Sequence, residues 1–134
     1  MATPNDRRYT DQHEWALVQG TDGTATVVRV GITDHAQDAL GDIVFVQLPA
    51  VGDQVIPGEP IGEVESTKSV SDIYAPVAGV VAAVNDALTD APETINADPY
   101  GAGWLVDISV AGEGGDPTGQ LLDADAYRAV VDAS

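Results

Sequence analysis

Apolar residues along the chain come in short, β-branched runs that are separated by glycine, proline and aspartate. This pattern is typical of a mostly β domain built from short strands. It predicts strands at 15–18, 24–30, 43–48, 61–66, 69–74, 80–84 and 104–110. Turns are predicted where glycine, proline and aspartate cluster, at 20–23, 76–79 and 112–119. The polar stretch 85–103 is expected to be mostly loop with one helical turn.

Two segments carry helical signals instead. Asp34 with a glutamine three residues later has the form of a helix start, and Gly41 stands where a short helix would stop, which predicts a helix near 34–40. Asp123 can cap a second, amphipathic helix near 124–132. The expected architecture is a β-sandwich or flattened barrel of short antiparallel strands, with one small internal helix and one C-terminal helix.

Composition limits the partners of this chain. Its 134 residues include 22 acidic and 5 basic side chains, which gives a net charge of -17. Such a chain is repelled by phosphate backbones and by anionic lipids, so we expect neither nucleic acid nor membrane as a partner. The length is that of one domain, and we expect a single domain over 1–134 with a loose N-terminal segment at 1–8.

The chain contains no cysteine, which excludes disulfides, thiolate nucleophiles and cysteine zinc sites. Its first residues lack the apolar core of a signal peptide and are too few and too polar for a transit peptide. We therefore expect a cytoplasmic, bacterial protein of a reducing compartment.

The usual catalytic patterns are weak here. His13 and Glu14 could form a base with its orienting carboxylate, but neighbouring residues of a strand point to opposite faces. His35 falls in the first turn of the predicted short helix, and the two histidines lack metal-ligand spacing. No Gly-x-Ser-x-Gly motif occurs. The sequence therefore predicts no catalytic residue and no metal site.

The one unusual chemical group is Lys68, the only lysine of the chain. Two alternating runs meet at Thr67-Lys68, so a β-hairpin would carry this lysine at its tip. A tip lysine is exposed on a flexible stem and is a good acylation target. Thr-Lys is not a favoured turn dipeptide, however. The isolation of Lys68 among 22 acidic residues counts against an ordinary solvated lysine, but composition alone does not overturn that interpretation.

The segment 65–72, followed by Pro76 and Gly79, resembles the lipoyl-attachment segment of the glycine cleavage system H-protein family. The resemblance extends over about 9–131. Further matching segments are Tyr9-Thr10, 13–15, 31–42, Leu48-Pro49, Val51-Gly52, 96–101, 103–105, 121–123 and Tyr127.

The resemblance implies a lipoyl/biotinyl-type fold and a carrier without catalytic activity, whose Lys68 carries lipoate as an amide. Glu65 and Gly79 stand where the family has residues important for recognition by the lipoylating enzyme. Glu14 and Asp72 match positions that line the cleft for the loaded arm, where a carboxylate would stabilise a cationic amine.

The resemblance also implies the partners. Glycine decarboxylase (P protein) would load the aminomethyl group, aminomethyltransferase (T protein) would pass the one-carbon unit to tetrahydrofolate, and dihydrolipoyl dehydrogenase (L protein) would reoxidise the carrier. The lipoylating enzyme is a fourth partner. The absence of cysteine fits this role, since no internal thiol could exchange with the lipoyl group.

Other carriers fit less well. Lipoyl domains of 2-oxo acid dehydrogenases usually have aspartate before the lysine, where this chain has Thr67, and biotin carriers flank the lysine with methionine, whereas the single methionine here is Met1. Two alternatives stay open: a related protein that donates or relays lipoyl groups to other complexes, and a binding relative in which Lys68 is never lipoylated.

Overall fold

The structure, a computed structural model, describes residues 2–22, 24–112 and 116–133. Nine strands and four helices lie within these ranges. In chain order they are β1 (Arg8–Tyr9), β2 (Glu14–Asp22), β3 (Ala25–Ile32), α1 (Asp34–Leu40), β4 (Ile43–Gln47), β5 (Gln54–Val55), β6 (Pro60–Ser66), β7 (Val70–Tyr74), β8 (Gly79–Val84), α2 (Ala87–Asp90), α3 (Thr94–Ala97), β9 (Val106–Ala111) and α4 (Ala124–Ala133).

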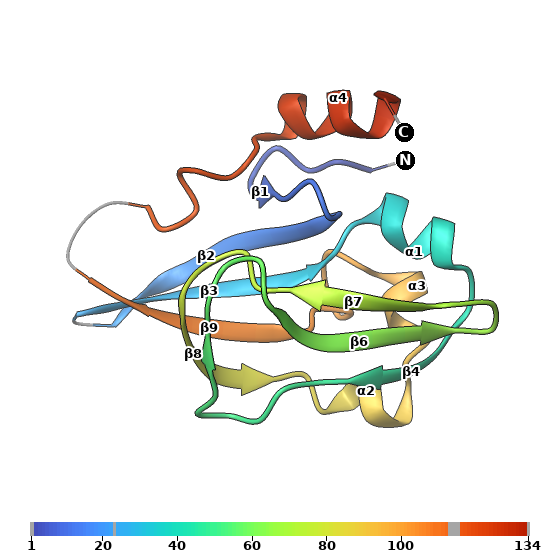
Figure 1. Ribbon diagram of the computed structural model, residues 1–134, viewed down its shortest axis with the longest axis horizontal. Helices are drawn as coiled ribbons and strands as arrows, with labels where there is room; N and C mark the ends of the chain where they lie inside the picture. Colours follow the sequence, from blue (N-terminus) through green and yellow to red (C-terminus); the bar gives the residue numbers. More distant parts are fainter. Residues whose placement is uncertain (1, 23, 113–115, 134) are drawn as a thin grey trace.

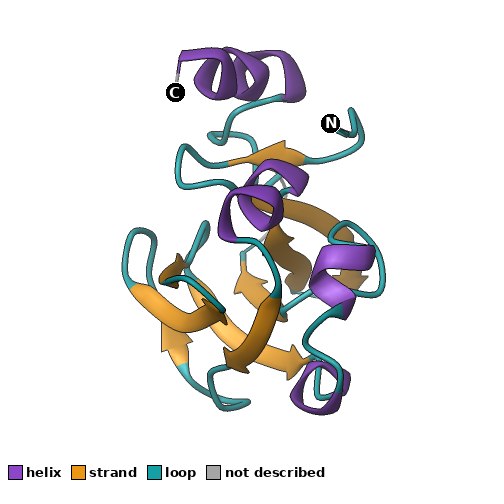
Figure 2. Cartoon of the chain, turned by 90° about the vertical axis from the view of Figure 1, so that its right-hand side faces the viewer, coloured by secondary structure: helices purple, strands orange, loops and turns teal. Residues whose placement is uncertain are grey.

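The strands form two antiparallel sheets. The larger sheet has the order β1-β2-β3-β9-β8-β5, and the smaller one has the order β4-β6-β7. The described strands do not join the two sheets into a closed barrel (Figures 1 and 2). Of the two predicted forms, the sandwich is therefore the one observed.

The main core lies between the two sheets. Val28 and Val30 of β3 and Ile108 of β9 are buried on the larger sheet, and Val64 and Ile73 are buried on the smaller one. Residues two apart in a strand share a face, so the alternating β-branched pattern places one apolar face of each sheet against the other.

A second cluster lies beneath α4, which sits above the strands in Figure 2. Tyr9 of β1 stacks on Tyr127 of α4 with ring centroids 4.7 Å apart. The Asp123 carboxylate accepts a 2.8 Å hydrogen bond from the Ala126 N–H, so the predicted cap and helix are confirmed. The ten residues of α4 make it the longest helix of the described ranges, and none of these helices is long and apolar enough to cross a membrane.

The predicted helix at 34–40 is confirmed as α1, but its cap was assigned to the wrong residue. The Thr33 side chain accepts the hydrogen bond from the Ala36 N–H at 3.1 Å, while Asp34 is the first helical residue. Gly41 ends the helix with φ of 83°, a conformation that glycine adopts without steric cost.

Other local predictions were wrong in detail. β2 continues through Asp22 where a turn was expected, and Gly23 lies outside the described residues. The stretch 85–103 contains two short helices, α2 and α3, rather than one turn. The last strand, β9, begins at Val106 instead of 104. Within the loop expected at 112–119, residues 113–115 lie outside the described ranges.

The expected loose segment at 1–8 is held by several contacts instead; Met1 is not among the described residues. The Ala2 N–H donates to Asp34 Oδ2 at 3.0 Å, and Arg7 Nη1 donates to the Tyr100 carbonyl at 3.0 Å. Arg8 belongs to β1. These partners are far away in the sequence, which is why local pattern could not indicate them.

Candidate functional site

The β6–β7 hairpin carries Lys68 at its tip, as predicted. Glu65 and Val70 form the last strand pair before the turn, and the Ser66 N–H donates to the Ser69 carbonyl at 2.8 Å. Thr67 and Lys68, the two residues between Ser66 and Ser69, are exposed. In Figure 1 this tip projects at the right-hand end of the smaller sheet.

The hydroxyl of Ser66 organises this turn. Ser66 Oγ accepts hydrogen bonds from the N–H groups of Lys68 at 3.3 Å and Ser69 at 3.1 Å, and it donates to the Ser69 carbonyl at 3.2 Å. The side chain thereby supplies the local bonding that Thr-Lys lacks as a turn dipeptide. Sequence reasoning overlooked this residue, although a serine at the start of a turn is a known signal.

The tip is also anchored to the connection between α1 and β4, which passes beside it in Figure 1. The Thr67 N–H donates to the Asp42 carbonyl at 3.2 Å. The Cε atom of Lys68 lies 3.6 Å from the position that a Cβ on Gly41 would occupy. Asn96 of α3 supports this connection, because its side chain donates to the Gly41 carbonyl at 2.9 Å. The backbone that carries Lys68 is therefore held by contacts with the connection between α1 and β4.

Glu14 is a buried carboxylate, with 1% of its surface exposed. Its Oε1 atom accepts a 2.7 Å hydrogen bond from the Thr10 hydroxyl, and its Oε2 atom accepts a 3.0 Å bond from the Tyr74 N–H. Burial raises the pKa of Glu14 to about 7, although both hydrogen bonds favour the charged form. The group can therefore change charge near neutral pH.

Glu14 lines a cavity of about 310 Å³. The walls come from four places: the segment from β1 to the start of β2, the loop between β5 and β6, the end of β7 with the following turn, and the segment before α4. The lining residues include Gln12, Tyr74, Pro76 and Leu122. The cavity combines an apolar wall with one buried carboxylate.

Asp72, the second residue expected in an arm cleft, does not line this cavity. It is exposed on β7 opposite Glu63, and it lines a larger, acidic hollow of about 510 Å³ beside β4 and β6. Glu14 contacts β7 through the backbone N–H of Tyr74, two residues after Asp72. Along the strand from the tip, Asp72 therefore precedes the Glu14 contact.

The two residues assigned to lipoylation recognition lie on different sheets. Glu65 stands on β6 next to the tip, whereas Gly79 begins β8 of the larger sheet. A Cβ on Gly79 would come 2.7 Å from Ile108 Cγ2 and would collide with the Ser109 carbonyl. Close packing of β8 on β9 is therefore a sufficient reason for glycine at this position.

His13 contacts Tyr127 of α4, and His35 contacts His13. His13 Nδ1 and the Tyr127 hydroxyl are 2.8 Å apart, and the ring of His13 lies 4.7 Å from that of His35. Burial, together with the nearby His35, lowers the pKa of His13. Because Glu14 bonds to Thr10 and Tyr74 instead, the two neighbours do not form a base–carboxylate pair. The described residues contain no group of three possible metal ligands.

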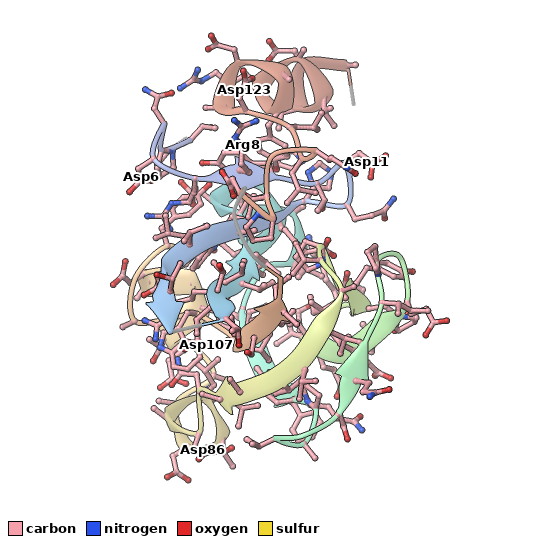
Figure 3. The ribbon with its side chains drawn as sticks, turned by 90° about the vertical axis from the view of Figure 1, so that its left-hand side faces the viewer. Asp6, Arg8, Asp11, Asp86, Asp107 and Asp123 are labelled. Atoms are coloured by element: carbon pink, nitrogen blue, oxygen red, sulfur yellow. The ribbon has the colours of Figure 1, made fainter. Side chains whose placement is uncertain are left out.

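Acidic residues cover widely separated parts of the surface. Figure 3 shows Asp123 at one end of the molecule, Asp86 at the other, and Asp6 and Asp11 on opposite sides between them. The cationic side chains are engaged elsewhere: Arg29 pairs with Asp107 at 2.9 Å, for example. Lys68 takes part in none of the ion pairs formed among the described residues.

Comparisons with known proteins agree with the geometry. The family model described as Glycine cleavage H-protein matches residues 7–134. The glycine cleavage system H protein of Mycolicibacterium smegmatis is 60% identical over 129 residues, which cover 96% of this chain and 95% of the relative. That of Beutenbergia cavernae is 55% identical over 131 residues, 98% of each protein. The crystal structure of a glycine cleavage system H protein from Mycobacterium marinum superposes with a TM-score of 0.83 at 49% identity, covering 96% of this chain and 98% of that one.

Proposed function

The chain belongs to the glycine cleavage H-protein family and is thereby a lipoyl carrier component of the glycine cleavage system; on this basis we propose that Lys68 is the residue that carries lipoate. The observation that carries this proposal is the position of Lys68. It is the only lysine of the chain, and it stands exposed at the tip of a hairpin that Ser66 and Asp42 brace. An amide at this amine would leave the hairpin contacts unchanged, because they involve backbone groups and the Ser66 side chain.

The residues present fit such a group. The amine is accessible for acylation, and β7 runs from the hairpin tip to Tyr74, which lines the cavity of Glu14. When bound, the lipoyl group supplies a dithiol–disulfide couple that this cysteine-free chain lacks. We assign no catalytic residue to the chain itself, and we take 1–134 as one carrier domain.

Glu14 and Asp72 would act on the cargo. A cationic aminomethyl amine near Glu14 favours the ionised carboxylate and lowers its pKa from about 7. Asp72 offers a second carboxylate on the way along β7. In this proposal the two act in sequence along one path rather than as walls of one cavity.

The chain would then visit three enzymes in turn: the pyridoxal-phosphate glycine decarboxylase, the aminomethyltransferase and dihydrolipoyl dehydrogenase. The acidic surface suits a carrier that must meet several partners and leave them again. Glu65 would contribute to recognition by the lipoylating enzyme. For Gly79 we propose the same role, through the packing that its missing side chain permits.

The site of attachment can be tested by intact mass with mapping of the modified residue. We expect a lipoyl adduct on Lys68 and none on a Lys68→Arg variant, which keeps the charge. A lysine-specific protease should cut the unmodified chain once and the modified chain not at all. Mild reduction should reveal two thiols per chain only in the modified form. An adduct elsewhere, or a chain that is never modified when the lipoylating enzyme is supplied, would refute the proposal.

A further inference from the structure

A row of three side chains crosses the smaller sheet beside the hairpin tip. Phe45 of β4 is paired with Glu65 of β6, and Glu65 is paired with Val70 of β7. Paired residues of antiparallel strands project to the same face. Val46 directly follows Phe45, and Val64 directly precedes Glu65. Both valines are buried in the core. Phe45, Glu65 and Val70, here called the outer row, therefore face away from the core.

The outer row contains two large apolar side chains that are exposed to solvent and not packed in the core. Phe45, the only phenylalanine of the chain, is 53% exposed, and Val70 is 54% exposed. Val44, on the bulge of β4 beside Phe45, is 52% exposed. Aromatic side chains at the centre of a patch are common anchors of protein interfaces. The patch lies at one end of the sheet, the end that carries Lys68.

The outer row lies close to the Lys68 amine along the hairpin. Val70 follows Lys68 by two residues and Glu65 precedes it by three, which corresponds to roughly 7–10 Å along extended strands. An enzyme that forms a bond at Lys68 Nζ must enclose the tip and will cover these neighbours. An enzyme that works on the far end of a lipoyl arm is separated from them by the whole arm.

We infer that the outer row is the docking surface for the enzyme that acylates Lys68, with Phe45 and Val70 as apolar anchors on either side of Glu65. This inference rests on the proposed function, because it assumes that Lys68 is acylated. It extends recognition from a single carboxylate to a surface formed by three strands.

The acidic residues beside the outer row indicate which charges the partner surface carries. Glu63 and Asp72 form the next paired row on the same face, and both are exposed. The complementary surface is an apolar depression with arginine or lysine side chains opposite Glu65 and this second row. A second copy of the chain is a poor occupant, since it would bring the same carboxylates together.

The reaction that docking serves is an acyl transfer. The neutral Lys68 amine attacks the carbonyl carbon of an activated lipoyl group such as an acyl adenylate, a mixed anhydride whose leaving group is AMP. The new amide bond forms as the bond to the leaving group breaks, the leaving group departs with its electron pair, and the amine proton passes to solvent. No group is oxidised or reduced.

The test uses unmodified chain, a lipoate ligase, ATP and lipoate, with initial rates from intact mass at several chain concentrations. The Phe45→Ser/Val70→Ser double variant should raise KM roughly tenfold or more with little change in kcat. Glu65→Gln should raise KM and weaken its dependence on salt. Val51→Ser is the matched control: Val51 is 62% exposed but lies beyond the opposite end of β4, and its KM should stay within about twofold of wild type.

Further results separate the possibilities. Because both side chains are exposed, thermal unfolding of the double variant should be the same as that of wild type. A change in KM then reports docking and not loss of folded protein. The lipoylated double variant should still be reoxidised by dihydrolipoyl dehydrogenase at the wild-type rate; an equal loss there would overturn the assignment to the acylating enzyme. A KM equal to that of wild type, or concentration-dependent dimers that the double variant abolishes, would overturn the inference. Failure of wild-type Lys68 to gain any lipoyl mass would instead refute the proposed function.

Discussion

The Glu14 carboxylate accepts a 3.0 Å hydrogen bond from the backbone N–H of Tyr74, sixty residues later in the chain. Glu14 begins β2 of the larger sheet, and Tyr74 ends β7 of the smaller one. The bond therefore ties the hairpin that carries Lys68 to the opposite layer. Since the carboxylate is buried and its pKa is about 7, this tie depends on pH.

Glu14 should make folding stability fall as pH rises. Its folded-state pKa lies above its usual value of 4.5, so the native state binds the extra proton between pH 4.5 and about 7. Its stabilising contribution is complete below 4.5 and lost as pH passes 7. Urea unfolding at pH 5.0 and 8.0 should show a wild-type-minus-Glu14→Gln difference that changes by about 2 kcal/mol between the two pH values. The lowered pKa of His13 has the opposite effect on stability. Because His13 is present in both proteins, its contribution cancels in the difference between wild type and Glu14→Gln. A constant difference would contradict the assignment.

Removing the Ser66 hydroxyl should loosen the hairpin tip. Ser66→Ala deletes an acceptor for two N–H groups and a donor to one carbonyl, and we expect a loss of about 1 kcal/mol because water can replace part of this bonding. Hydrogen exchange should accelerate at the Lys68 and Ser69 amides. Ser69→Ala is the control, because Ser69 joins the turn through its backbone. Equal protection in both variants would mean that the hydroxyl does not organise the turn.

Local pattern was sufficient where short-range chemistry determines the structure. The helix 34–40 ends at a glycine with positive φ, and the α4 cap is formed within the first turn, so both were predictable. The hairpin was predictable from two alternating runs. The strands β1 and β5 have two residues each, too few to give a period, and they exist because of partners distant in the sequence.

The site could be predicted only as separate residues. Lys68 was identifiable because it is the only lysine and because the family motif surrounds it. Its braces were not, since Asp42 and Asn96 act on the tip through contacts that only the fold creates. Likewise, no pattern indicated that Glu14 and Asp72 line different cavities. Their relation depends on the fold, since Glu14 reaches the backbone of β7 at Tyr74 while the Asp72 side chain lines the hollow beside β4 and β6.

Gly79→Ala should destabilise the fold by about 1–3 kcal/mol, because the new Cβ has no room against Ile108 and Ser109. Urea unfolding measures this loss, and Ala82→Ser, an exposed change on the same strand, should be nearly neutral. Lipoylation of the folded fraction separates packing from recognition. If the variant is as stable as wild type and yet poorly lipoylated, Gly79 contacts the enzyme directly.

Tyr127→Phe should weaken the attachment of α4. The hydroxyl is 2.8 Å from His13 Nδ1 and 2.7 Å from the buried Thr33 hydroxyl, and its loss should cost about 1–3 kcal/mol. Trypsin cleavage at Arg128 should accelerate, since the helix must open locally before it can be cut. Tyr74→Phe, on the opposite layer, is the control. Cleavage at the wild-type rate would show that the hydroxyl contributes little and that the packing of α4 on the second cluster holds the helix.

Loading by the glycine decarboxylase should slow as salt rises. With a net charge of -17, the chain attracts a basic partner surface over a distance that shortens from about 10 Å at 0.1 M ionic strength to about 3 Å at 1 M. Because such steering acts on encounter, kcat/KM should fall while kcat changes little. Neutralising exposed carboxylates near the tip, Glu63→Gln with Asp72→Asn, should reduce the salt dependence more than Asp125→Asn with Asp132→Asn on α4, which packs against β1. A value of kcat/KM that is independent of ionic strength would show that the acidic surface serves solubility and does not steer the encounter.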